Sequence, residues 1–204
     1  MTRSPTATLA RAPVGADTED ARLVAAAAAG DRPAFAELYR RHLDSVYARL
    51  TRLIGPFPDR DDLVQEIFLD VHRALPRFRG EAAFTTFLHR IVLNVACEHL
   101  QRRQRARDRT GRLDDRQLEA LIAPGASPEQ RARQREELRR LFARMDALSP
   151  KRRAAFVLVA VEGMALEEAG ALLGTNAPAV KQRVLEARRE LAEALDRPAK
   201  KESP

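Results

Sequence analysis

The sequence predicts an all-α protein made of two small helical domains that are joined by a flexible linker. Ala, Leu, Arg and Glu dominate its 204 residues, and these are strong helix formers. Apolar residues recur with a period of about 3.6 residues, and no stretch alternates apolar and polar residues as a strand would. Because only 5% of the residues are aromatic and Trp is absent, the composition favours two modest cores over one thick core.

The N-terminal domain is expected over residues 18–103. An extension, 1–17, precedes it, and its mixture of Pro, Ala, Thr and Gly predicts disorder. A first helix over about 20–29 should stop at Gly30, since glycine commonly ends helices. Asp31 is placed to cap the second helix, which carries a clear apolar stripe.

Two further helices complete the predicted N-terminal domain. The third begins near Asp59, after a Pro-rich break, and the fourth follows Gly80 and ends in a run of arginines. The third helix turns its apolar residues inward and keeps an acidic face outward. This acidic face consists of Asp61, Asp62, Gln65, Glu66 and Asp70.

A linker is predicted over 104–127, because the helical pattern dissolves there over a stretch too long for an ordinary helix connection. The C-terminal domain is expected over 128–197, followed by a disordered tail, 198–204. Ser127 and Gln130 have the spacing of a capping box at its first helix. Its first two helices should bury Leu138, Leu141, Phe142, Met145, Leu148, Phe156, Val157, Ala160 and Val161.

The end of this domain has the layout of a helix-turn-helix. A short helix over about 166–173 and a turn at Gly174 precede a longer, basic helix capped by Asn176. Four side chains of the last helix lie off its apolar stripe and suit base edges and phosphates in a major groove: Lys181, Gln182, Arg183 and Arg188. A plain helical hairpin with a solvated charged face is the alternative, since Glu186 and Glu190 dilute the basic charge.

Composition narrows the class of partner. The chain has 36 Lys and Arg residues against 29 Asp and Glu residues, which gives a net charge of +7. This excess favours a polyanion as the binding partner, although a GC-rich genome also fills protein surfaces with arginine. The single cysteine excludes an internal disulfide, and no signal peptide or membrane-length apolar run is present, so we expect a cytoplasmic protein without membrane insertion. We find no phosphate loop, nucleophile–base pair or metal-ligand spacing, and therefore expect no enzyme, no cofactor, no metal and no small-molecule substrate.

Two N-terminal features each leave two interpretations open. The acidic face is either a solvated helix face, with acids near the helix N-terminus, or a docking site for a basic protein. The aromatic, Arg and hydroxyl residues around Gly80 would suit unstacked bases, but Phe84 or Phe87, or both, should be packed in the core.

Together, these motifs resemble bacterial RNA polymerase sigma factors of the extracytoplasmic-function (ECF) group. Residues 61–68, DDLVQEIF, are similar to the family signature D-L-V-Q-E-x-F, and 74–80, ALPRFRG, resemble the loop that follows it. Residues 87–100, FLHRIVLNVACEHL, are similar to W-L-x-R-I-A-x-N-x-A-x-D-x-L. Further likeness lies at 148–156, at 167–174 and, as VKQR, at 180–183.

The resemblance implies a sigma region 2 domain followed by a region 4 domain, and three sites. Asp62, Gln65 and Glu66 would dock on the β′ clamp helices of core RNA polymerase. Flipped bases of the −10 promoter element would be captured by Phe78, Thr85, Arg90 and Asn94. The −35 element would be read as duplex DNA by Asn176, Lys181, Gln182, Arg183 and Arg188, while the domain rests on the β flap.

The resemblance also implies promoter melting without ATP and an anti-sigma factor as a further partner. Glu186, where a basic residue is common, and Pro178, early in the recognition helix, depart from the family pattern. Two other hypotheses remain: a stand-alone helix-turn-helix regulator, and a module binding RNA or single strands through the first domain. A regulator should bind duplex DNA on its own, whereas a free sigma factor should bind it weakly.

Overall fold

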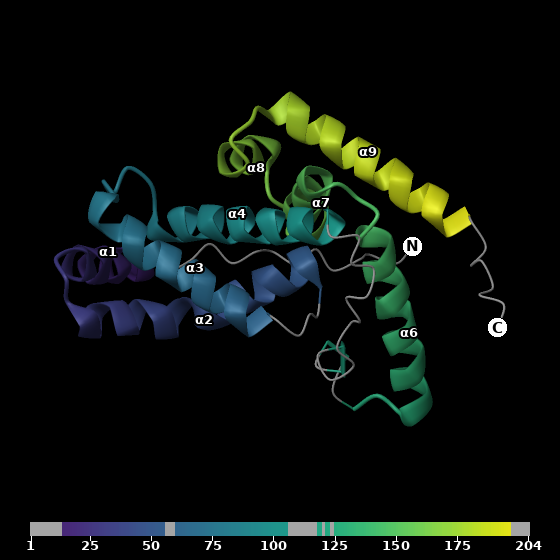
Figure 1. The fold of residues 1–204 in the computed structure, drawn as a ribbon, viewed down its shortest axis with the longest axis horizontal. Coiled ribbons are helices and arrows are strands. Elements are labelled where there is room, and N and C mark those ends of the chain that lie inside the picture. Colours follow the sequence, from purple (N-terminus) through teal and green to yellow (C-terminus); the bar gives the residue numbers. More distant parts are fainter. Residues whose placement is uncertain (1–13, 56–59, 106–117, 120, 123–124, 197–204) are drawn as a thin grey trace.

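The N-terminal unit is a bundle of four α-helices. The computed structural model describes residues 14–55, 60–105, 118–119, 121–122 and 125–196. The unit consists of α1 (Val14–Ala28), α2 (Arg32–Ile54), α3 (Arg60–Ala74) and α4 (Phe84–Arg105), with a 3-10 turn η1 (Leu75–Arg77) after α3 (Figure 1). Its core contains Leu38, Leu50, Ile67, Leu88 and Val92, each almost completely buried.

Local sequence signals set most of the boundaries in this unit. The Asp31 carboxylate accepts a hydrogen bond from the Ala34 N–H at 3.1 Å and caps α2, as predicted. Gly55 ends α2 with a positive φ of 87°. The predicted start of the first helix was late: α1 begins at Val14, so residues 14–17, which we expected in the disordered extension, are helical. The apolar pattern used for that prediction does not register the first turn of α1, which includes Gly15 and Asp17.

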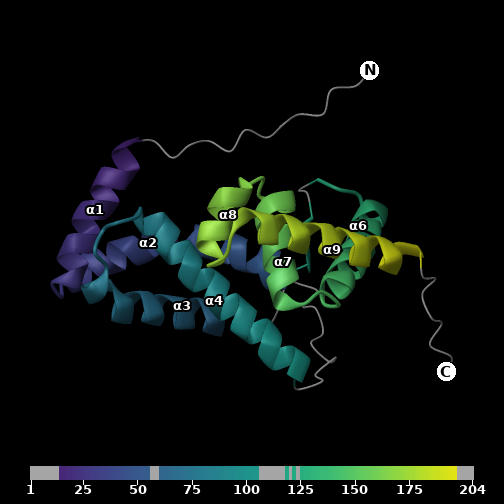
Figure 2. The ribbon, with the colours of Figure 1, turned by 90° about the horizontal axis from the view of Figure 1, so that it is seen from above.

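The C-terminal unit contains α6 (Pro128–Met145), α7 (Pro150–Phe156), a π-helical turn η2 (Val157–Val161), α8 (Leu166–Leu172) and α9 (Ala177–Asp196). The capping box at Ser127 and Gln130 is present. Seen from above, α9 runs across α8, α7 and α6 (Figure 2). The prediction of two all-α units is therefore confirmed, and the described residues include no strand.

Three residues predicted in this core lie outside it. Val161 is 55% exposed and Ala160 is also exposed, because the π-helical turn inserts an extra residue and rotates the buried face toward Leu158 and Glu162. Leu141 is 44% exposed. Its helix, α6, points away from the rest of the molecule (Figure 1) and buries Phe142 and Met145 near its C-terminal end instead.

Part of the predicted linker packs against α6. Leu118 and Ile122 are buried, whereas Leu121 is largely exposed. Glu119 forms ion pairs with Arg131 of α6, at 2.7 Å, and with Arg135. The linker, expected over 104–127, thus contains a short segment that folds onto the C-terminal unit.

The two units are in contact. Helix α4 lies beneath α7 and α8 (Figures 1 and 2), and the Gln104 amide of α4 donates a hydrogen bond to the Leu148 carbonyl at 3.1 Å. Phe142 of α6 packs so closely on Gly55 that a Cβ there would lie 2.9 Å from its ring. Within the described part of the chain, no helix combines the length and apolar character needed to cross a membrane.

Candidate functional site

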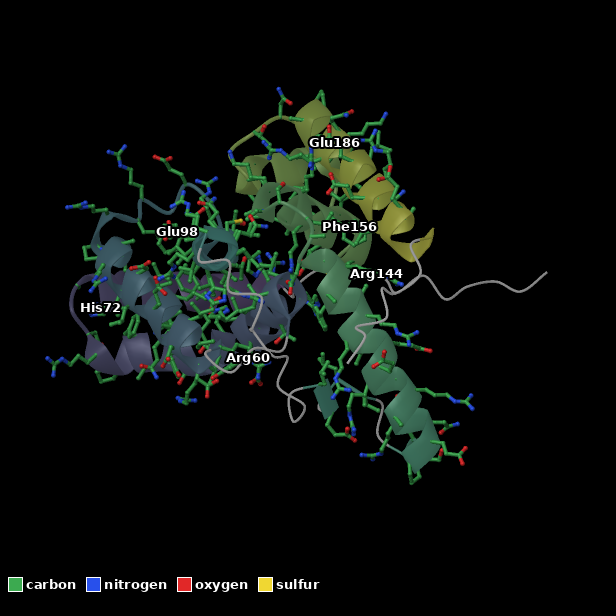
Figure 3. All side chains as sticks on the ribbon, turned by 45° about the vertical axis from the view of Figure 1, so that its right-hand side comes forward. Arg60, His72, Glu98, Arg144, Phe156 and Glu186 are labelled. Atoms are coloured by element: carbon green, nitrogen blue, oxygen red, sulfur yellow. The ribbon has the colours of Figure 1, made fainter. Side chains whose placement is uncertain are left out.

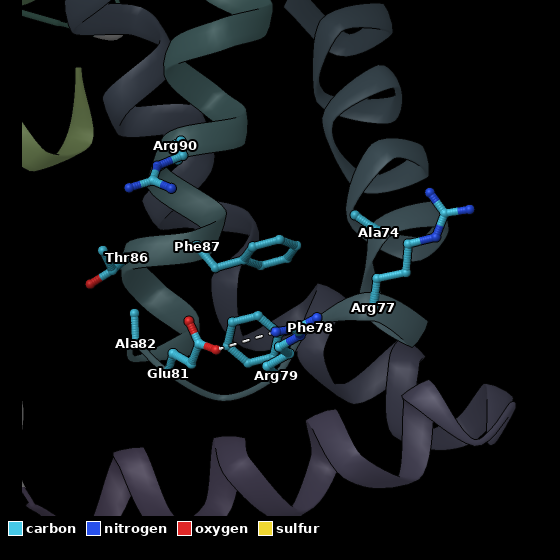
Figure 4. Close-up of a pocket in the computed structure, with 9 residues that line it drawn as sticks. All are labelled: Ala74, Arg77, Phe78, Arg79, Glu81, Ala82, Thr86, Phe87 and Arg90. Carbon is cyan, nitrogen blue, oxygen red and sulfur yellow. Dashed lines mark ion pairs between the residues drawn. The ribbon is translucent and has the colours of Figure 1, made fainter. Parts of the chain in front are cut away.

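A pocket of about 410 Å³ lies where the loop after η1 meets the start of α4. Pro76 fits the fixed backbone of the 3-10 turn, and Gly80, with a φ of 71°, reverses the chain so that α4 starts beside it. Figure 4 shows the side chains around this loop, with Arg77 and Arg90 on opposite sides. The α4 pocket is lined by Ala74, Arg77, Phe78, Arg79, Glu81, Ala82, Thr86, Phe87 and Arg90.

Aromatic rings form the apolar part of the α4 pocket. The ring centroids of Phe78 and Phe87 are 4.8 Å apart, and Phe84 packs beneath both from the core. Phe78 and Phe87 are half-buried, so each ring is held by packing and keeps an accessible part. Such rings offer a stacking surface to a planar base, worth about 1–3 kcal/mol per base. The expectation that Phe84 or Phe87, or both, would be packed in the core is confirmed for Phe84, which is buried, while Phe87 is half-buried.

The rim of the α4 pocket is basic. It carries three arginines and a single acid, Glu81, which pairs with Arg79 at 3.9 Å. Guanidinium groups around a stacking surface suit the phosphates of the strand that carries the base.

The structure brings together two of the four residues predicted for the −10 element. Phe78 and Arg90 line the α4 pocket, whereas Thr85 and Asn94 do not. Thr86 lines the pocket instead of Thr85. Residues four apart share a helix face, and Thr86, Arg90 and Asn94 follow one another at this spacing along α4. Asn94 is exposed one turn beyond the pocket.

Two charged residues that line the pocket, Arg77 and Glu81, were not among the residues predicted for this site. Arg77 lies in the 3-10 turn and Glu81 in the loop, where no helical periodicity shows which side chains converge. Their shared feature is proximity to Gly80, whose turn brings the loop back toward α4.

Helix α8 of the C-terminal unit contacts Arg90, one of the residues that line the α4 pocket. The Arg90 guanidinium donates a hydrogen bond through Nη2 to the Ala171 carbonyl at 3.0 Å. In this arrangement the C-terminal unit contacts the face of α4 that carries Arg90.

The acidic face of α3 remains accessible. Asp62 and Gln65 are exposed and Glu66 is half-buried, with the Arg102 guanidinium 3.6 Å from its carboxylate. Asp61 differs from these, because it accepts a hydrogen bond from the Tyr47 hydroxyl at 2.9 Å. Burial, and then this bond, raise the pKa of Tyr47.

An apolar residue that the sequence reasoning missed lies beside these acids. Leu69 is 55% exposed and follows Gln65 by four residues, which puts it on the same face of α3. Single exposed apolar side chains are ordinary on protein surfaces, so Leu69 adds apolar contact area beside the acids without by itself marking an interface.

Helix α9 presents most of the predicted −35 residues. Lys181, Gln182 and Arg188 are exposed, and Arg183 is half-buried. The Asn176 side chain instead accepts a hydrogen bond from the Ala179 N–H at 2.9 Å and caps α9.

A close approach fixes the turn between α8 and α9. A Cβ on Gly170 would lie 2.9 Å from the Thr175 carbonyl oxygen, so only glycine fits the space between α8 and this turn. Among the residues that the structure describes, no group of His, Cys, Asp and Glu is arranged to hold a metal ion.

Comparisons with known proteins agree with this arrangement. The family model Sigma-70 region 2 matches residues 38–106, and Sigma-70, region 4 matches residues 138–191. The ECF RNA polymerase sigma factor SigM of Mycobacterium tuberculosis is 35% identical, over 88% of this chain and 86% of SigM. The RNA polymerase sigma factor CnrH of Cupriavidus metallidurans is 36% identical, over 89% of this chain and 97% of CnrH.

One further relative and a solved structure of CnrH extend the comparison. SigE of Mycolicibacterium smegmatis is 35% identical over 82% of this chain, and the match covers 65% of SigE, just under two thirds of its length. A solved structure of CnrH in complex with the cytosolic domain of CnrY superposes with a TM-score of 0.57 and 29% identity, covering 87% of this chain and 97% of that one.

This chain therefore belongs to the ECF RNA polymerase sigma factors. It is an alternative sigma factor that directs transcription initiation, and the alternative of a stand-alone regulator is not favoured.

Proposed function

We propose that this sigma factor reads promoters at two places, with the α4 pocket taking an unstacked base of the −10 element and α9 entering the major groove of the −35 element. The α4 pocket carries the proposal, because it combines a preformed aromatic surface with a basic rim. Unstacking a base costs a few kcal/mol, which stacking and polar contacts in a preformed pocket offset without ATP.

Phe78→Ala should weaken binding to a single-stranded −10 oligonucleotide by roughly tenfold, because one base loses its stacking partner. The matched variant is Phe78→Leu, which keeps the apolar bulk that packs on Phe84 but lacks the aromatic face. Both variants should be weakened in binding, measured by fluorescence anisotropy with the holoenzyme. Wild-type affinity in both would rule out stacking on Phe78, and a loss only in the Ala variant would assign it a packing role.

For polymerase docking, we propose the accessible part of the acidic face: Asp62, Gln65 and Glu66, extended by Leu69. The acids would attract a basic partner, and Leu69 would supply apolar contact area. By the family resemblance, this partner is the β′ clamp-helix surface of core polymerase, and the C-terminal unit would rest on the β flap.

The double variant Asp62→Ala, Gln65→Ala should bind core polymerase roughly tenfold more weakly while its thermal unfolding is unchanged, because both side chains are exposed. Asp44→Ala removes an exposed acid from α2, outside the acidic face, and is the matched control. Affinity can be measured by competition against a labelled wild-type chain. Equal affinity in the double variant and the control would place polymerase docking elsewhere.

Simultaneous reading of both elements requires the two units to separate. The −10 and −35 elements lie about 25 base pairs apart, roughly 85 Å along B-form DNA. In this structure, however, α8 of the C-terminal unit contacts Arg90 of the α4 pocket directly. Because the segment from Leu118 folds onto the C-terminal unit, residues 106–117 connect the two units, and these 12 residues can span up to roughly 40 Å when extended, which lets the units move apart. We infer that the contact between units precedes promoter binding.

We also propose that an anti-sigma factor holds this protein inactive. The support is the solved complex of the relative CnrH with the cytosolic domain of CnrY. Co-purification of a second protein with the tagged chain, followed by loss of transcription when that protein is added to the holoenzyme, would test this partner.

A further inference from the structure

The two acids of α9 that dilute its basic charge are both held by one arginine of α7. Arg152 donates through Nε to Glu186 at 2.7 Å and through Nη1 to Glu190 at 2.6 Å. Glu186 also accepts a hydrogen bond from the Gln182 amide nitrogen at 2.9 Å. Figure 3 places Glu186 on α9, away from Arg60 and His72 of the N-terminal unit. Arg152, Glu186 and Gln182 thus form a chain of contacts that ends on the exposed side of α9.

This chain of contacts determines the orientation of the Gln182 amide. Hydrogen bonds from Gln182 and Arg152 lower the pKa of Glu186, so its carboxylate is ionised near neutral pH and can only accept. Gln182 must therefore turn its NH₂ group toward Glu186 and its carbonyl oxygen away. One N–H of the amide contacts Glu186, and the carbonyl oxygen and the other N–H belong to an exposed side chain that another group can reach.

An amide edge held in this way is complementary to one base in particular. In the major groove, adenine presents the N6 donor beside the N7 acceptor, and a glutamine amide matches both with its oxygen and one N–H. A glutamine on an isolated helix would lose rotamer freedom on binding and could present either end of the amide. The contact with Glu186 removes that ambiguity before DNA arrives, and Arg152 keeps the Glu186 carboxylate in place and offsets its charge near phosphates.

We propose that Arg152 and Glu186 are positioning residues that orient Gln182 to read an adenine in the −35 element. The proposal rests on the proposed reading of the −35 element by α9. It assigns a role to Glu186, the position at which the chain departs from the basic residue common in the family, and to Arg152, which lies on another helix.

The test is transcription by the reconstituted holoenzyme from a promoter library in which the −35 element is randomised. Wild type should prefer adenine at one position on one strand, and Gln182→Ala should abolish that preference. Glu186→Gln and Arg152→Ala should reduce it roughly tenfold at the same position and leave the other positions unchanged. Neither should reduce it further in combination with Gln182→Ala, because they act through that residue.

The control for Arg152→Ala is Lys151→Ala, which removes an equal charge from the exposed neighbour on α7 and should leave the preference intact. Three results would overturn the proposal. The first is an unchanged adenine preference in Glu186→Gln. The second is a change in base preference at a different position, as expected if Glu186 itself accepts a hydrogen bond from cytosine, and the third is an equal loss of transcription on every −35 sequence. The wild-type result distinguishes failure of the proposed −35 reading from failure of the positioning role. If wild type shows no −35 preference, the proposed −35 reading fails; a −35 preference that Gln182→Ala leaves unchanged refutes only the positioning role.

Discussion

Asp146→Ala should destabilise the C-terminal unit by about 3 kcal/mol, because it leaves a buried arginine without its partner. The Arg153 side chain is only 1% exposed, and its Nη1 donates to the Asp146 carboxylate at 2.5 Å. Among the residues that the structure describes, none forms a hydrogen bond with its Nε or Nη2, so Asp146 provides its main compensation. Burial lowers the pKa of Arg153, and the Asp146 charge opposes this. This loss of stability lies at the low end of the roughly 3–5 kcal/mol that a broken buried ion pair costs, because Asp146 itself is partly exposed.

The free energy can be measured by hydrogen exchange of the α7 amides, which isolates this unit from the unfolding of the other. Arg153→Met combined with Asp146→Ala is the matched variant, because it removes the buried charge and keeps most of the volume. Its stability should return close to wild type, since apolar replacements of buried ion pairs are often neutral. Equal destabilisation in the single and double variants would show that Asp146 acts through α6 or through Arg103 of α4, 3.4 Å from its carboxylate, and not through the Arg153 charge.

Features encoded by neighbouring residues could be predicted from the sequence. The caps at Asp31 and Ser127 were predicted because donor and acceptor lie within three residues of each other. The helix-turn-helix and the acidic face followed from helical periodicity in the same way. The errors at Val161 and Leu141 have another origin: a π-helical turn changes the period, and α6 buries only part of its apolar stripe.

Features that depend on distant contacts could not be predicted. Glu186 looked like an unfavourable charge on a DNA-reading helix until the structure placed Arg152, 34 residues earlier in the chain, beside it. The α4 pocket was only half predicted, since Arg77 and Glu81 converge through a glycine turn that has no periodic signal. The contact of Glu162 with Arg52, 110 residues away, had no sequence signal either.

Glu162→Ala should separate the two units rather than unfold either of them. Glu162, after η2, lies 2.7 Å from the Arg49 guanidinium and 3.2 Å from that of Arg52, both on α2 of the other unit. The Glu162 and Arg49 side chains are 6% and 10% exposed, and burial lowers the pKa of Arg49 while Glu162 opposes this. Without Glu162, keeping Arg49 buried costs about 3–5 kcal/mol. Separation returns Arg49 to water, so the units should move apart once this cost exceeds the free energy of their contact.

Small-angle X-ray scattering measures this directly, and the radius of gyration of Glu162→Ala should rise while its helix content, by circular dichroism, stays the same. Glu167→Ala removes an exposed acid from α8 with the same change in charge and should leave the radius unchanged. Separation also releases Arg90 from the Ala171 carbonyl, so the free Glu162→Ala chain should bind a −10 single strand more tightly than wild type. An unchanged radius with a lower unfolding temperature would instead mean that the contact between units withstands an unpaired Arg49. The interface between the units would then be a permanent part of the fold. Separation of the units on promoter DNA would then depend on interactions other than the ion pair of Glu162 and Arg49.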